Sequence, residues 1–145
     1  MAKIPFVRDM AFAYGASDQV SPLIRRVVAN NPGPFTFRGT GVYIVGRDEV
    51  AVIDPGPDDP AHIEALQRAL AAERVSHIFV THRHLDHSPA ARPLAAATGA
   101  KIYASGIAPK FSDDDFVAEA GDDLGFKPDI AVSDGDLFSG PDWTL

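Results

Sequence analysis

The chain has 145 residues, no cysteine and a formal net charge of −7. The length suits one domain with a core of its own, and the lack of cysteine excludes disulfides, thiolate metal sites and a thiol nucleophile. A bound metal ion would therefore be held by imidazole and carboxylate groups. No stretch approaches the roughly 18 consecutive apolar residues of a membrane helix, and the start lacks the apolar region of a secretion signal. We expect a cytoplasmic protein with no membrane partner.

Most of the negative charge falls in one segment. Residues 112–136 contain nine acidic side chains and a single base, Lys127, with few apolar residues between them. Such a composition predicts a solvated, mobile surface loop within a single unit that spans residues 1–145. A calcium site is the alternative for this segment, but the D-x-D-x-D-G spacing is missing.

The first half of the chain predicts short strands. Residues 20–28 carry a β-branched run, and the sequence Asn-Pro-Gly-Pro at 31–34 is a turn signal. Further strands are predicted at 35–37, 41–45 and 50–53, the last two joined by a hairpin connection at 46–49.

The second half alternates helices and strands. Asp59 and Pro60 predict the N-cap and first residue of a helix, and a strand is expected at 75–81. A second helix is expected from Ser88-Pro89 to Gly99; Pro93 lies inside it, so that helix either begins late or bends. With a last strand at 101–104, the order predicts a mixed α/β fold.

The segment at 81–87 carries the chemistry. It reads Thr81-His82-Arg83-His84-Leu85-Asp86-His87, and four of the five histidines of the chain lie between His77 and His87. It directly follows a predicted buried strand, and the carboxyl ends of such strands are where α/β sheets place ligand sites.

The spacing suggests two metal ions. In extended backbone, residues two apart point the same way, so His82 and His84 can face one ion. Asp86 and His87 are adjacent and point away from that pair, which suits a second ion beside the first. A catalytic zinc ion usually has three protein ligands, so each ion would lack at least one. We expect the other two histidines, His62 and His77, to be structural.

Three neighbours of these ligands have predicted supporting roles. Asp54 ends the preceding strand at the same sheet edge, where it would orient a ligand or the metal loop; the alternative is an ordinary turn aspartate before Pro55. Thr81 is expected to hydrogen-bond the loop backbone from behind the ligands. Arg83 and Leu85 are expected to be packing or rim residues.

These residues resemble the metallo-β-lactamase-fold hydrolases. The segment 81–87 is similar to their T-H-x-H-x-D-H signature, and Val52-Ile53-Asp54-Pro55-Gly56 to their first motif, a strand ending in aspartate. Residues 31–36, 39–46 and 88–91 further resemble a β-lactamase-like branch with a C-terminal winged helix, some members of which are endoribonucleases. The resemblance covers nearly the whole chain from Val20 onward.

The resemblance implies a four-layer αββα sandwich, of which this chain would be the N-terminal half. In the complete protein, two zinc ions would be held by His82, His84, Asp86 and His87, with iron or manganese as alternatives. The second half of such proteins supplies another histidine, a bridging aspartate and a final histidine. The chain stops just where that part is expected, so the 145-residue piece is expected to be inactive alone, with partial or no metal occupancy.

The expected activity is hydrolysis by a metal-bound hydroxide, with Asp86 orienting the attacking water as the catalytic residue. The substrate would be a small ester, thioester, other acyl compound or phosphodiester, or RNA in the full-length branch. The alternatives are a catalytically incomplete fragment or assembly subunit, which could form a homodimer through its exposed sheet face, and a mononuclear iron oxidoreductase of the same fold.

Overall fold

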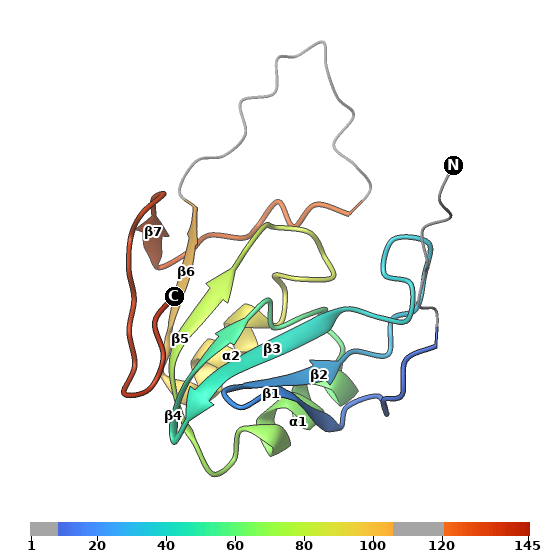
Figure 1. Ribbon diagram of the computed structural model, residues 1–145. Coiled ribbons are helices and arrows are strands. Elements are labelled where there is room, and N and C mark those ends of the chain that lie inside the picture. Colours follow the sequence, from blue (N-terminus) through green and yellow to red (C-terminus); the bar gives the residue numbers. More distant parts are fainter. Residues whose placement is uncertain (1–8, 106–120) are drawn as a thin grey trace, which may run out of the picture.

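The computed structural model describes residues 9–105 and 121–145. Within them, seven strands form one sheet with two helices, as Figure 1 shows. The strands are β1 (Ser17–Ser21), β2 (Ile24–Val28), β3 (Gly41–Arg47), β4 (Glu49–Ile53), β5 (Arg74–Val80), β6 (Lys101–Ser105) and β7 (Ile130–Val132), and the helices are α1 (Pro60–Ala69) and α2 (Ala91–Thr98). In these described ranges, no helix is long and apolar enough to cross a membrane.

The strands lie in the sheet in chain order. The first four strands pair antiparallel, whereas β4, β5, β6 and β7 pair parallel. Parallel neighbouring strands need a crossover connection. Helix α1 provides the one between β4 and β5, and α2 the one between β5 and β6. As a result, β4 and β5 end at the same edge of the sheet, and the loops that follow them meet there. This mixed α/β architecture confirms the predicted fold class.

One face of the sheet is covered by both described helices (Figure 1). Helix α1 begins as predicted, with the Asp59 carboxylate accepting a hydrogen bond from the backbone N–H of Ala61 at 3.1 Å. Leu66 of α1 and Leu94 of α2 are fully buried against Ile78 of β5 and its neighbours. This packing fixes the frame from which the two loops project.

Three local predictions were wrong. Residues 20–28 form two strands, β1 and β2, because the chain turns at Pro22, whose ring removes a strand hydrogen bond. Residues 35–37 form a turn instead of a strand, with Phe37 at a φ of 54°. Ser88 does not cap α2, so the predicted start of that helix was wrong. The helix begins late, at Ala91, which was one of the two outcomes predicted from Pro93; this proline lies in the first turn, where no intrahelical N–H bond is needed.

The acidic segment predicted as a loop at 112–136 is described only from residue 121; residues 112–120 lie outside the described residues. The described part contains β7, a strand that was not predicted. Asp129 is tied to β6, since its carboxylate accepts a bond from the N–H of Ile102 at 2.9 Å and its own N–H donates to the Ile102 carbonyl at 2.8 Å. The mobility of the segment stays a prediction.

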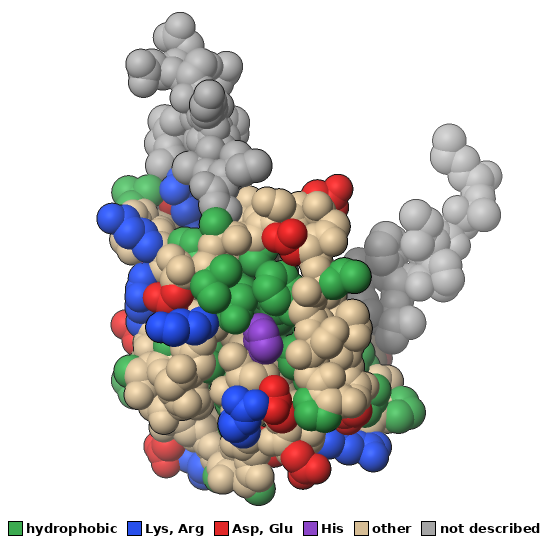
Figure 2. Space-filling model, turned by 90° about the vertical axis from the view of Figure 1, so that its left-hand side faces the viewer, with side chains coloured by type: hydrophobic (Ala, Val, Ile, Leu, Met, Phe, Trp, Pro, Cys, Tyr) green, Lys and Arg blue, Asp and Glu red, His purple; other side chains and the backbone are tan. Residues whose placement is uncertain are grey.

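The other face of the sheet carries a cluster of rings. The ring centroid of His77 lies within 6.0 Å of those of four aromatic residues: Phe79, Tyr103, Phe138 and Trp143. Trp143 is buried, and its indole N–H donates to the Glu49 carbonyl at 3.0 Å. Viewed from the side of β6 and β7, hydrophobic side chains gather beside a histidine (Figure 2). His77 thus has the structural surroundings that the sequence predicted for it.

His77 should make stability depend on pH. Burial lowers its pKa below the ordinary 6.5; Glu49 raises the pKa by less, and Arg74 lowers it slightly further. Above the pKa that His77 has in the unfolded chain, the ring is neutral in both the folded and the unfolded protein. As the pH falls below that pKa, the unfolded chain binds a proton more readily than the folded protein does. The free energy of unfolding therefore decreases until the pH passes the pKa of the folded state. We therefore expect His77→Phe to lose less stability than wild type when the pH is lowered from about 7.5 to about 5.5 in urea unfolding.

The matched control is Tyr103→Phe, which alters a ring of the same cluster but leaves the imidazole in place. This variant should keep the wild-type change of stability with pH. A His77→Phe protein whose stability falls as steeply as that of wild type would contradict the prediction.

Candidate metal centre

The loop at 81–87 follows β5 and lies beside the end of β4, where Asp54 stands. The Asp54 N–H donates to the carbonyl of Phe79 in β5 at 2.8 Å, so Asp54 extends the parallel pairing of the two strands by one residue. Its φ of 50° is a left-handed conformation that aspartate tolerates better than most residues. The chain turns sharply there, and the carboxylate faces the neighbouring loop.

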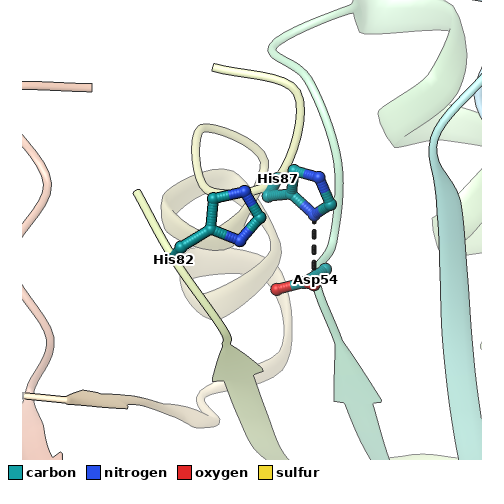
Figure 3. A group of neighbouring side chains, drawn as sticks. All are labelled: Asp54, His82 and His87. Carbon is teal, nitrogen blue, oxygen red and sulfur yellow. Dashed lines mark ion pairs between the residues drawn. The ribbon is translucent and has the colours of Figure 1, made fainter. Parts of the chain in front are cut away.

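The histidines of the motif converge. The ring of His82 lies 4.6 Å from that of His84 and 4.2 Å from that of His87, between centroids. The carboxylate Oδ2 of Asp86 is 3.1 Å from His87 Nε2. The structure therefore brings all four predicted ligands together, and Figure 3 shows the rings of His82 and His87 side by side, with Asp54 below them and paired with His87.

Asp54 holds the loop through Thr81. Its Oδ1 accepts from the Thr81 N–H at 2.7 Å, and its Oδ2 accepts from the Thr81 hydroxyl, also at 2.7 Å. Thr81 thus bonds with a side chain, although the sequence had suggested the loop backbone. The Asp54 carboxylate is buried and receives donors from the first residue after β5, which fixes where the metal loop begins.

The same threonine fixes the tautomer of His82. Thr81 Oγ1 lies 2.9 Å from His82 Nδ1, and its single hydrogen is already donated to Asp54. His82 Nδ1 must therefore carry the proton and donate, which leaves Nε2 with a lone pair for a metal ion. Burial lowers the pKa of His82, as do His87 and His84 nearby, and this favours the neutral imidazole that metals bind.

Asp54 also faces His87. The buried His87 Nδ1 lies 3.0 Å from Asp54 Oδ2. Burial would lower the pKa of His87, but Asp54 and then Asp86 raise it above its ordinary value. Burial would raise the pKa of Asp54, but His87 and Thr81 lower it. His87 thus has Asp54 beside Nδ1 and Asp86 beside Nε2.

Asp54, His82 and His87 place three donor atoms within 4.8 Å of one another, a spacing compatible with a metal ion. Both oxygens of Asp54, however, already accept bonds from Thr81. This arrangement suits a carboxylate that orients the histidines better than one that ligates the ion. The orienting role of Asp54 stays a prediction.

His84 has a partner that the sequence did not reveal. Its Nε2 lies 3.4 Å from Asp122 Oδ1, and the other oxygen of that carboxylate is 3.1 Å from the guanidinium of Arg83. Backbone bonds from Leu85 to Gly121 and from Asp123 to Arg83 hold the two segments together. Asp122 comes from the acidic segment, which composition had classed as solvated; nothing local in the sequence marks this one acid among nine.

His62, the other histidine predicted to be structural, is buried away from the motif. Its Nε2 donates to the Pro55 carbonyl at 2.8 Å and so fixes the loop after β4. Gly56 lies against this ring with a φ of 101°, and its N–H donates to the His87 carbonyl at 3.0 Å. The loop after β4 therefore also holds the end of the metal loop.

The donor set fits a transition metal. Imidazole nitrogens and a carboxylate are ligands of zinc, iron and manganese, and the proton on His82 Nδ1 leaves its Nε2 as a donor to a metal ion. Because these groups must be unprotonated to bind a cation, metal affinity should rise with pH.

The family assignment agrees with this geometry. A model of the metallo-beta-lactamase superfamily matches residues 36–145. The chain belongs to this superfamily. The solved structures similar to it include BJP-1, a subclass B3 metallo-beta-lactamase of Bradyrhizobium japonicum, at 22% identity and a TM-score of 0.62 over 89% of this chain and 49% of that one. Another is MIM-1 from Novosphingobium pentaromativorans, at 26% identity and a TM-score of 0.61 over 85% and 46%.

Curated relatives of this superfamily member match over a shorter stretch. A lactamase-like protein of Pestalotiopsis microspora is 40% identical over 74 residues, which is 49% of this chain and 23% of the relative. An atrochrysone carboxyl ACP thioesterase of Cryptosporiopsis is 39% identical with the same coverage. The match thus spans about a quarter of the length of these relatives.

The pairing of Asp54 with His87 can be tested by Asp54→Asn. Asparagine also tolerates the left-handed conformation but carries no charge, so the pKa of His87 should fall in the metal-free protein, because the nearest group that raises it is neutralised. NMR titration of the His87 ring measures this directly.

Asp48→Asn is the matched control, because Asp48 has a similar φ of 59° in the turn between β3 and β4, away from the motif. It should leave the titration of His87 unchanged. If the pKa of His87 were unchanged in Asp54→Asn, its pairing with Asp54 would not be what raises that pKa.

Proposed function

We propose that this chain carries the metal-binding loop of a metal-dependent hydrolase that cleaves an acyl bond. The observation that carries the proposal is the convergence of His82, His84, Asp86 and His87 at the edge shared by β4 and β5, with Asp54 and Asp122 behind the rings. Membership in the metallo-beta-lactamase superfamily supports it.

In this proposal, His82 and His84 hold one zinc ion, and Asp86 and His87 hold a second. Bound zinc would supply a Lewis acid for the substrate carbonyl and lower the pKa of a water molecule toward neutrality. Asp86 has a second task, to accept a hydrogen bond from the attacking water and orient it. Two ligands per ion fall short of the usual three, so the proposal includes ligands beyond these four residues.

We infer a thioester as the first substrate class to test. Among the relatives similar to this chain, several are named acyl-carrier-protein thioesterases, at 35–39% identity over 74 residues. Thioesters, esters and lactams share an electrophilic acyl carbonyl, and all suit attack by an activated water. A phosphodiester is the alternative, and the net charge of −7 disfavours RNA as its source.

Metal binding is the first test. The purified full-length protein should bind Zn²⁺, and its double variant His82→Ala/His84→Ala should lose at least one equivalent by elemental analysis. His77→Ala is the matched control, because His77 lies in the ring cluster of the opposite face, outside the motif. Less than one equivalent of metal in wild type, unchanged in the double variant, would refute a metal site at the motif.

Hydrolysis is the second test. The zinc-loaded full-length protein should hydrolyse an acyl-pantetheine thioester faster than bis(p-nitrophenyl) phosphate, and the double variant should lose this activity by at least about 100-fold, because activation of the water depends on the metal. Faster cleavage of the phosphate diester would overturn the acyl assignment while leaving the metal site standing.

A further inference from the structure

Thr40 reaches the metal loop from a distant part of the chain. It directly precedes β3, is only 5% exposed, and its hydroxyl donates to Asp86 Oδ2 at 2.9 Å. The two residues are 46 positions apart in the sequence.

Asn31 determines the direction of this hydrogen bond. Its Nδ2 donates to Thr40 Oγ1 at 3.1 Å, and its Oδ1 accepts from the Thr40 N–H at 2.8 Å, which fixes the orientation of the amide. Since the hydroxyl oxygen of Thr40 already accepts from Asn31, its hydrogen is directed at Asp86. The three side chains form a one-way chain of donors, from Asn31 through Thr40 to Asp86.

The turn between β2 and β3 is built around this contact. The Thr36 hydroxyl donates to the Asn31 carbonyl at 2.6 Å, and the Ala29 N–H donates to the Thr40 carbonyl at 2.9 Å. Gly39 has a φ of 126°, and a Cβ there would lie 2.1 Å from the Ala29 carbonyl oxygen. Only glycine fits at that point, and it lets the chain place Thr40 under the metal loop.

We propose that Thr40, oriented by Asn31, is a positioning residue for Asp86. Its hydrogen bond holds the carboxylate at one rotation beside His87 Nε2, 3.1 Å away, so that these two ligand atoms are preorganised for one ion. A hydroxyl does this without adding positive charge, whereas a lysine or arginine at this position would neutralise the carboxylate and repel a cation. The proposal rests on the proposed function, because it assigns Asp86 to a metal ion.

Thr40→Val tests the proposal, because valine has the shape of threonine but no hydroxyl. In Zn²⁺ titrations against a chromophoric chelator, we expect Thr40→Val to bind the Asp86-dependent ion about ten- to a hundredfold more weakly. Thr40→Ser, which keeps the hydroxyl, should stay within about threefold of wild type, well short of that loss. Thr98→Val is the control, since the Thr98 hydroxyl donates to the Leu94 carbonyl and accepts from the Ala100 N–H, both outside the motif.

A double-mutant cycle distinguishes the positioning of Asp86 by Thr40 from a purely structural role of Thr40. If Thr40 acts through Asp86, Thr40→Val should weaken zinc binding little further when Asp86 is already Asn. An equal loss in both backgrounds would overturn the proposal. Should Thr40→Val fail to fold by circular dichroism, Thr40→Ala carries the same prediction.

The outcomes also separate this proposal from the proposed function. Wild type that binds zinc, loses it in His82→Ala/His84→Ala, but binds equally well as Thr40→Val would overturn the role of Thr40 alone. Wild type that binds no zinc would overturn both.

Discussion

The candidate site depends on one buried carboxylate, that of Asp54. It extends the pairing of β4 with β5 through its backbone, accepts two hydrogen bonds from Thr81, and faces His87 at 3.0 Å. Because Thr81 in turn sets the tautomer of His82, the Asp54 carboxylate determines through Thr81 which nitrogen His82 offers to a metal ion. Burying that charge is unfavourable by itself; the three partners offset the cost and lower its pKa.

Much of the fold and the ligand set could be predicted, because both rest on local signals. Asp59-Pro60 marks the start of α1, and the H-x-H-x-D-H spacing identifies four residues that the structure does bring together. Pro22 shows the limit of such reasoning: β-branched neighbours indicated one strand, but one proline made two. A strand as short as β7 has no sequence pattern long enough to detect, because its position depends on its pairing with β6.

The supports of the ligands could be predicted only in part, for the same physical reason. Asp54 was accessible to sequence reasoning because it ends a strand next to the motif strand. Asp122 was not accessible to sequence reasoning, because it is one of nine similar acids in its segment. It contacts His84, which lies 38 positions earlier in the sequence. Composition predicts the average behaviour of a segment, whereas the role of one residue depends on where tertiary pairing places it.

The three supports come from different parts of the chain: Thr40 from before β3, Asp54 from the end of β4, and Asp122 from beyond β6. Each meets a different ligand of one short loop, Asp86, His87 and His84 respectively. The seven-residue motif lies in the loop between β5 and α2, and its side chains would sample many rotamers on their own. Contacts from three separate segments limit that freedom only after the sheet has formed. The geometry needed for metal binding is therefore a consequence of the whole fold, although every ligand atom of the motif lies within a few positions in the sequence.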